Sequence, residues 1–306
     1  MAQLTRRSFL GRSAVATAAL ATPLPRVLAA AEQLPAIVDV HGADVAQMVD
    51  AALSALGGIG RFMKPGAVVA IKPNVAFASP REWATATNPD VVVALARACL
   101  KAGAKKVQVI EYPVHDGSKT LVTSGLGAAL KGLPEVEIKL LGDDRDFVRA
   151  TVRDGLVLKT VDVAKLAVEA DLLISVPVAK SHSATGVSFG MKNSMGLIRD
   201  RKLFHVAVDI HQALVDLVRV IRPQLTVLDA TRALLTGGPR GPGETIEPGR
   251  IIAGSSMVSV DAYGLTVGRF NGRDNAPADI KHIALAGKAG LGEIDLNKMV
   301  IEKLLV

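Results

Sequence analysis

The sequence predicts an α/β fold, built on a mostly parallel sheet with helices on both of its faces. Short and nearly continuous apolar runs are typical of strands that are covered on both sides, and they occur at residues 68–71, 106–110, 172–176, 225–228 and 250–253. Segments with apolar residues at helical spacing alternate with these runs. This alternation favours parallel strands that are joined by helical crossovers.

The helical segments have recognisable ends. One helix is predicted from Val45 to Leu56, where two glycines stop it. A second begins with an N-cap and a first-turn proline at Asn88-Pro89 and runs to Leu100. A third is predicted over residues 205–221. Since no repeat, linker or clear boundary interrupts residues 32–306, we expect one α/β domain there, with a bilobed arrangement left open.

Composition excludes several classes of protein. The chain has 306 residues, of which 49% are hydrophobic, so it is able to bury a core and is not expected to be disordered. Its single cysteine, Cys99, excludes a disulfide framework and argues against an iron–sulfur cluster held by this chain alone. Aromatic residues make up only 3% of the sequence, which argues against a surface that stacks on nucleic-acid bases.

The N-terminal segment has the order of a signal peptide. Thr5-Arg6-Arg7-Ser8-Phe9-Leu10 precedes an uncharged stretch over residues 13–24, and small residues follow at 29–31. The segment resembles the twin-arginine export motif S/T-R-R-x-F-L-K, with Gly11 in place of the lysine. We therefore expect residues 1–31 to be a signal peptide, cleaved between Ala29 and Glu32. An ordinary N-terminal helix is the alternative, although no acidic residue precedes Glu32.

This resemblance implies that the protein folds in the cytoplasm and is exported to the periplasm or another extracytoplasmic compartment. The apolar stretch is shorter than the roughly 20 residues that span a bilayer, so we expect no stable membrane anchor after its removal. The segment also carries four arginines and no acid, and without it the net charge falls from +7 to +3. That surplus is too small to indicate a nucleic-acid partner.

Charged and polar side chains follow the predicted strands. In open parallel sheets, ligands bind beyond the carboxyl ends of the strands. Lysine ammonium groups and amides there are suited to an anionic ligand or cofactor, and we assign that role to Lys72, Asn74, Lys192, Asn193 and Arg240. Acid/base or catalytic roles are assigned to Lys180, His182, Glu111 and Asp229. The alternative is that each of these residues is a helix cap or an ordinary solvated charge.

A divalent metal is a second possible occupant of this edge. Asp229, Asp261 and His205 are the candidate ligands, but no H-x-x-x-H or H-E-x-x-H pair fixes two histidines on one helix face. An alternative for His205 is a pairing with Asp209 one helical turn later. The glycine-rich loop at residues 237–243 lacks the spacing of a nucleotide-binding loop. It is either a plain surface turn or a loop that brings Arg240 over an anion.

Eight motifs, in order along the chain, resemble those of the domain of unknown function 362 family. They are Val69-Ala70-Ile71-Lys72-Pro73-Asn74, Thr87-Asn88-Pro89, Ala102-Gly103-Ala104-Lys105-Lys106-Val107, Pro177-Val178-Ala179-Lys180-Ser181-His182, Met191-Lys192-Asn193-Ser194-Met195-Gly196, Asp229 ahead of Gly237-Gly238-Pro239, Ser259-Val260-Asp261-Ala262, and Gly290-Leu291-Gly292. Many members of that family carry an added cysteine-rich, ferredoxin-type segment, and this chain departs from them in having none. The resemblance implies a fold group but no defined reaction.

Two functional hypotheses follow. The first is an exported protein that binds a small anionic molecule, a cofactor or a divalent metal at the strand ends and performs acid/base chemistry there. The motifs also have a distant likeness to those of lactate racemases, which use lysine and histidine in a cleft. For the first hypothesis, this likeness suggests racemisation or proton transfer next to a carboxylate as the reaction. The second hypothesis is a non-catalytic accessory protein that acts with an iron–sulfur or other redox partner.

Overall fold

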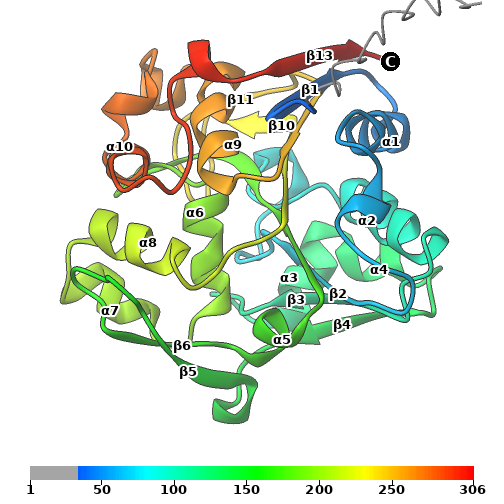
Figure 1. Cartoon of the computed structure of the whole chain (residues 1–306), viewed down its shortest axis with the longest axis horizontal. Helices are drawn as coiled ribbons and strands as arrows, with labels where there is room; N and C mark the ends of the chain where they lie inside the picture. The colour runs from blue at the N-terminus through cyan, green and yellow to red at the C-terminus, as the bar shows by residue number, and fades with distance from the viewer. Residues whose placement is uncertain (1–33) are drawn as a thin grey trace, which may run out of the picture. The chain divides into compact units, whose positions relative to one another are not determined.

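A mixed, mostly parallel sheet forms the centre of the molecule in the computed structural model, which describes residues 34–306 (Figure 1). Its main path follows the spatial order β13 (Ile301–Leu305), β1 (Ile37–His41), β12 (Arg250–Gly254), β10 (Leu225–Leu234), β7 (Leu172–Val176), β2 (Val68–Pro73), β3 (Lys106–Glu111) and β4 (Val136–Leu140). The strands from β10 to β4 run parallel to one another. Strand β12 is antiparallel to both β1 and β10, whereas β13 is parallel to β1. The predicted α/β fold is therefore confirmed.

Helices cover both faces of the sheet. Alternate residues of the central strands point to opposite faces, so each strand contributes to two apolar clusters. Ile71 and Ile174 belong to the apolar cluster that packs under α1 (Val45–Ala55), α2 (Pro89–Lys101) and α4 (Leu126–Leu130). Ala70 and Leu173 belong to the cluster under α6 (Gly190–Asn193), α8 (Ile210–Val218), α9 (Met257–Gly264) and α10 (Lys281–Lys288). Figure 1 shows these two helix groups on opposite sides of the molecule.

The predicted elements match the structure except for one helix. All five predicted strands are present, as β2, β3, β7, β10 and β12. Asn88 caps α2 by accepting a hydrogen bond from the Asp90 amide at 3.1 Å. The helix predicted over residues 205–221 is wrong, because the chain forms α7 (Arg201–Val206) and then α8. The break occurs at Asp209, whose carboxylate accepts the His211 amide at 2.9 Å and begins the new helix.

Strand β8 (Val178–His182) contains two predicted site residues that were expected in a loop, Lys180 and His182. The sequence predicts Lys180 and His182 beyond the end of a strand, but both lie within β8, which follows β7 and pairs with β10. Asp229 likewise lies inside β10, which is longer than predicted. The remaining short elements are α3 (Gly117–Ser124), β5 (Phe147–Thr151), β6 (Thr160–Ala164), α5 (Lys165–Glu169), β9 (Gly186–Val187) and β11 (Thr245–Ile246).

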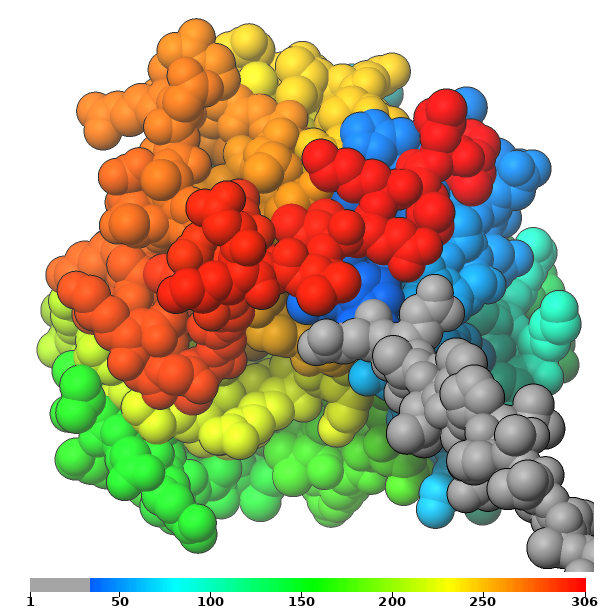
Figure 2. All heavy atoms as spheres, turned by 45° about the horizontal axis from the view of Figure 1, so that its top comes forward, coloured from blue at the N-terminus to red at the C-terminus, as the bar shows by residue number. Residues whose placement is uncertain are grey.

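The two ends of the described chain lie side by side. Ile37 of β1 is in register with Ile301 of β13, and Figure 2 shows the C-terminal segment in red against the blue segment that contains β1. Residues 34–306 form one unit. No helix in that range is long and apolar enough to cross a membrane. The predicted signal peptide and its cleavage zone lie outside the described residues.

Candidate functional site

A cavity of about 300 Å³ opens at the carboxyl edge of the sheet. Strands β3 and β7 flank β2 on either side, and all three are parallel, so their carboxyl ends meet at this edge. The chain leaves β2 for β3 in one direction and returns to β7 on the other side, which makes this edge the topological switch point where open α/β sheets bind ligands. The residues that line the cavity are Asn74, Ala76, Phe77, Glu111, Val114, Lys180, His182, Ser183, Ala184, Ser188, Lys192, Asn193, Met195, Gly196, Arg201, His205 and Pro239.

Most of the predicted site residues come together at this cavity. Seven of them line it directly, namely Asn74, Glu111, Lys180, His182, Lys192, Asn193 and His205. Lys72 lies behind this lining, where its ammonium group donates hydrogen bonds to Glu111 Oε2 at 2.9 Å and to Asn193 Oδ1 at 3.1 Å. A third hydrogen bond joins Lys72 to the carbonyl of Pro73.

The Lys72–Glu111 ion pair is fully enclosed. Lys72 is 1% exposed and Glu111 is 4% exposed, so the ammonium charge depends on its carboxylate partner. Burial lowers the pKa of Lys72, and the charge of Glu111 opposes that change. Glu111 Oε2 also accepts the Val75 amide at 2.7 Å, which ties the end of β3 to the chain that leaves β2.

The other oxygen of Glu111 has no hydrogen-bond partner among residues 34–306. Glu111 Oε1 is buried, and Glu111 lines the cavity. Gly196 faces it, where a Cβ atom would lie only 2.6 Å from Lys72 Cε and closer still to Oε1. A buried carboxylate oxygen is normally satisfied by a donor, which here is either a water molecule or a hydroxyl or amino group on a bound molecule.

Lys180 is the second buried lysine of the site and is held differently. It is 1% exposed, and its Nζ donates to Asn74 Oδ1 at 3.0 Å and to the Thr85 carbonyl at 2.6 Å. The hydroxyl of Thr87 accepts a hydrogen bond from the backbone N–H of Asn74 at 2.8 Å, which fixes the position of Asn74. Burial, followed by repulsion from Lys192, lowers the pKa of Lys180 to about 7.

Three cationic side chains at the cavity have no carboxylate partner. In residues 34–306, no carboxylate oxygen lies within 4.0 Å, the limit for an ion pair, of a side-chain nitrogen of Lys180, Lys192 or Arg201. Arg201 instead donates to the carbonyls of Tyr112 at 2.7 Å and Pro113 at 2.9 Å. Burial lowers the pKa of Lys192 to about 8, and it also lowers that of Arg201. The cavity therefore has excess positive charge in a poorly hydrated place, which favours an anion.

His182 presents a hydrogen-bond donor to the cavity. Its Nδ1 accepts the Ala184 amide at 3.1 Å, so the neutral ring carries its proton on Nε2. Burial and then the neighbouring charge of Lys192 lower the pKa of His182 to about 3, which keeps the ring neutral. His205 is exposed at the cavity rim. Its alternative pairing with Asp209 is not formed, because Asp209 instead pairs with Lys281 at 2.7 Å.

Asp261 supports the site from behind. Its two carboxylate oxygens accept the amides of Gly190 at 2.7 Å and Met191 at 2.8 Å, at the start of the helix that carries Lys192 and Asn193. Burial raises the pKa of Asp261 to about 7. Gly190 must lack a side chain, because a Cβ atom there would lie 2.9 Å from Asp261 Oδ1.

Asp229 and Arg240 are not among the residues that line the cavity. Asp229 Oδ2 accepts the Asn88 amide at 2.7 Å, and its Oδ1 accepts the Thr231 amide and hydroxyl, so it fastens α2 to β10. Burial raises the pKa of Asp229. Arg240 is exposed on the glycine-rich loop, which reaches the cavity through Pro239.

The three candidate metal ligands do not converge. Across residues 34–306 there is no group of three or more His, Cys, Asp or Glu side chains arranged to hold a metal ion. The set of cysteines that an iron–sulfur cluster needs is also missing from this range, because Cys99 of α2 is the single cysteine and is buried in the apolar cluster. Burial raises the pKa of that thiol to about 12.

Three residues that line the cavity, Arg201, Phe77 and Gly196, have no predicted role. Gly196 belongs to the motif that contains Lys192, and Arg201 follows it five residues later, so their place in the sequence was the available signal. The ring centroid of Phe77 lies 5.2 Å from Lys180 Nζ. Nothing in the sequence near Phe77 distinguishes it from a core aromatic residue.

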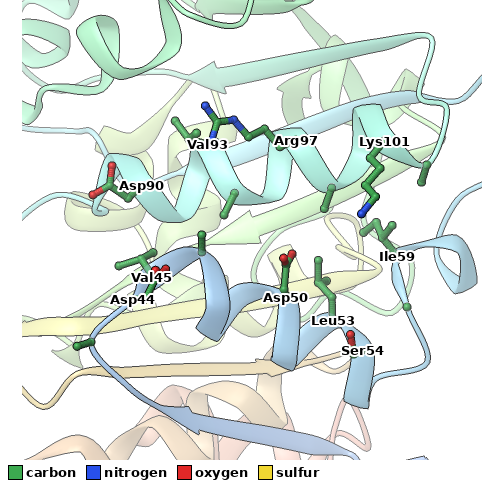
Figure 3. A pocket seen from close by; sticks show the side chains of 16 residues that line it. Asp44, Val45, Asp50, Leu53, Ser54, Ile59, Asp90, Val93, Arg97 and Lys101 are labelled. Atoms are coloured by element: carbon green, nitrogen blue, oxygen red, sulfur yellow. The ribbon is translucent and has the colours of Figure 1, made fainter. Parts of the chain in front are cut away.

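A larger hollow of about 1170 Å³ lies elsewhere, between α1 and α2 (Figure 3). Its charged side chains include Asp50, Asp90, Arg97 and Lys101, all of which are exposed. Because their charges are hydrated and of both signs, this groove does not select one kind of ligand. The smaller cavity at the sheet edge is therefore the candidate site.

The fold and this site together define an α/β protein with a cation-lined cavity at the carboxyl edge of its sheet. The chain belongs to the family described as domain of unknown function (DUF362), whose model matches residues 69–266. This match covers Lys72, Glu111, Lys180, Lys192 and Arg201. The predicted family membership is confirmed.

Three known proteins are similar to this chain. A thylakoid-associated protein from Synechocystis sp. is 28% identical over 216 residues, which cover 68% of this chain and 65% of that protein, less than two thirds of its length. The lactate racemase apoprotein from Thermoanaerobacterium thermosaccharolyticum has a TM-score of 0.52 at 13% identity, over 76% of this chain and 57% of that one, and it shares the fold. A crystal structure of a protein from Thermotoga maritima has a TM-score of 0.42 at 14% identity, over 60% of this chain and 50% of that one.

Proposed function

We propose that this protein binds a small anionic molecule in the cavity at the carboxyl edge of its sheet and performs acid/base chemistry on it. The observation that carries the proposal is that Lys192 and Arg201, with Lys180 beside them, line the cavity without a carboxylate partner in residues 34–306. Uncompensated charges are costly to bury, so a bound anion would stabilise the site. The volume of about 300 Å³ lies at the small end of ligand cavities and suits a short carboxylic acid or a phosphate.

The acid/base part of the proposal depends on two groups that the protein leaves free. Glu111 Oε1 is an acceptor without a partner in the described chain, and His182 directs a donor Nε2 from a neutral ring. These two groups orient a bound molecule by hydrogen bonds, whereas proton transfer requires a group that titrates near the working pH. Lys180 adds a third, since its pKa of about 7 lets the amine both gain and lose a proton near neutral pH.

A thermal unfolding assay tests anion binding. Acetate, pyruvate and inorganic phosphate are added separately to the mature protein at constant ionic strength, so that general screening is the same in each sample. An anion at one hundred times its Kd is expected to raise the Tm by roughly 5–10 °C. Lys105→Met, which removes an exposed lysine, is expected to behave as the wild type. The proposal fails if all three anions leave the Tm unchanged, or if they raise it equally in Lys192→Met.

We further propose that the protein reaches an extracytoplasmic compartment as a folded molecule, by the twin-arginine route. The support is the N-terminal sequence itself, in which Arg6 and Arg7 precede an uncharged stretch and no acidic residue occurs before Glu32. Retention of a folded, ligand-filled site during export is consistent with this route.

Conservative replacement of the arginine pair tests the route. The double variant Arg6→Lys, Arg7→Lys keeps both charges but loses the motif, so it is expected to accumulate in the cytoplasm of a bacterium that has the translocase. Arg12→Lys lies outside the pair and serves as the matched control. Immunoblots of periplasmic and cytoplasmic fractions give the result. Equal export of the double variant and the control would contradict the proposal.

A further inference from the structure

Lys180 and Lys72 are both buried at the candidate site, and only one of them is paired. Lys72 meets Glu111 at 2.9 Å, whereas Lys180 has no carboxylate partner within the range 34–306. Its two hydrogen-bond partners, Asn74 Oδ1 and the Thr85 carbonyl, are both neutral acceptors. Burial destabilises the charged form of a lysine, and neutral acceptors offset this less than a carboxylate does, so these surroundings favour the uncharged amine.

The number of these acceptors fits an uncharged amine. A neutral primary amine has two N–H donors and one lone pair, and the two acceptors at 3.0 and 2.6 Å occupy both donors. The lone pair is then left without a partner, on a side chain that lines the cavity. The ring of Phe77 lies beside the same nitrogen, with its centroid 5.2 Å from Nζ.

We propose that Lys180 is a nucleophile that captures a small 2-oxo acid as a Schiff base, with Lys192 and Arg201 binding the carboxylate of that substrate. This inference rests on the proposed function and names its substrate class. A desolvated lysine near a second cation is a recognised way to make an amine nucleophilic. The two unpaired cations select a carboxylate, the amine selects a carbonyl, and the small cavity favours the shortest molecules that contain both groups.

The reaction requires no oxidant or reductant. The lone pair of Nζ attacks the carbonyl carbon, a C–N bond forms, and the carbonyl oxygen receives a proton from the nitrogen. The resulting carbinolamine loses its hydroxyl group together with the second nitrogen-bound hydrogen as water, which leaves the C=N bond. The Nε2 donor of His182 stabilises negative charge on the oxygen during the attack, and the free Glu111 Oε1 accepts a hydrogen bond from the carbinolamine hydroxyl.

The charged groups around Lys180 set its pH dependence. Burial is the main cause of its lowered pKa, Lys192 and Lys72 lower it further, and Glu111 raises it. The uncharged amine is the reactive form, so its fraction increases as the pH rises through about 7. An exposed lysine would show the same increase only near its ordinary pKa of about 10.4.

Borohydride trapping tests the inference on the wild-type protein. Pyruvate and sodium borohydride are added together, and hydride reduction converts a Schiff base into a stable N-carboxyethyl lysine that peptide mass spectrometry locates. The expected result is one adduct per chain, at Lys180, with a yield that rises with pH around 7 and is reduced by excess acetate, which has no keto group to form a Schiff base. Lys180→Arg has no amine that can form a Schiff base and is expected to lose the adduct, whereas Lys105→Arg is expected to form the adduct at Lys180 as the wild type does.

The outcomes separate the two proposals. If pyruvate raises the Tm of the wild type but no adduct forms at Lys180, the Schiff base is wrong and the anion site stands. If Lys180 is modified but acetate does not compete, the amine is reactive and the carboxylate site is wrong. Modification of Lys192 in place of Lys180, or of exposed lysines at the same rate, would overturn the inference. Because the adduct is mapped on the wild type, this result holds even if Lys180→Arg fails to fold.

Discussion

Glu111→Gln is expected to lower the free energy of unfolding by about 3–5 kcal/mol, which is the cost of removing one partner from a buried ion pair. Glutamine keeps the shape of the side chain and is able to accept the Val75 amide, so the change isolates the lost charge. Lys72 would remain 1% exposed with only carbonyl and amide oxygens around its ammonium group. Its pKa is already lowered by burial, and Glu111 is the group that opposes this effect.

Urea unfolding, followed by circular dichroism, measures this loss, and a double variant supplies its control. Lys72→Met combined with Glu111→Gln removes both charges, so no unpaired charge is left in the interior. The double variant is therefore expected to be more stable than Glu111→Gln alone. A loss below about 1 kcal/mol for Glu111→Gln would show that the pair contributes no more than one on the surface, and would contradict its role.

Gly196→Ala disturbs the same pair without removing either partner. The new Cβ atom would lie 2.6 Å from Lys72 Cε, so the lysine and Glu111 must move, at a cost of about 1–3 kcal/mol. Gly132→Ala introduces the same methyl group where no atom lies within 4 Å, and it is expected to leave stability unchanged. Similar unfolding curves for the two variants would mean that the space at Gly196 is not needed.

Lys192→Met and Arg201→Met are each expected to weaken anion binding by about 10- to 150-fold, the equivalent of one lost hydrogen bond to a charged group at about 1.5–3 kcal/mol. Both side chains line the cavity and lack carboxylate partners within the described chain. The double variant is expected to lose measurable affinity. Since Arg201 also donates to the carbonyls of Tyr112 and Pro113, Lys192→Met is the cleaner of the two single variants.

Isothermal titration with the anion that raises the wild-type Tm most gives these affinities. Lys202→Met is the matched control, because Lys202 is next to Arg201 but exposed and outside the lining of the cavity. Circular dichroism spectra establish that each variant is folded. Wild-type affinity in Lys192→Met and Arg201→Met would place the anion away from these two side chains.

Much of the fold was predictable, because it depends on local patterns. The five buried strands are apolar runs, and Asn88-Pro89 carries its own helix signal. The break between α7 and α8 was missed because apolar periodicity continues across Asp209, and only the cap made by that carboxylate reveals the interruption. Strand β8 was missed for a different reason, since it is defined by pairing with β10 and carries polar residues that resemble a loop.

The candidate site was predictable as a list of strand-end residues, but their separate roles were not. Lys72, Asp229 and Asp261 were grouped with Lys180 and Glu111, but only the last two line the cavity in the structure. Pairing of Lys72 with Glu111, residues 39 positions apart, depends on the parallel register of β2 and β3. The absence of a carboxylate partner for Lys180 in the described chain is likewise a property of the folded molecule.

The central claim is that the cavity at the sheet edge binds a small anion through Lys192 and Arg201, beside Lys180. A crystal structure of the mature protein, soaked in the anion with the highest measured affinity, tests it most directly. The account predicts density for one anion in the cavity, with its oxygens within hydrogen-bond distance of Lys192 Nζ and the Arg201 guanidinium. Saturating binding in solution, combined with ordered anion only outside this cavity, would contradict the account.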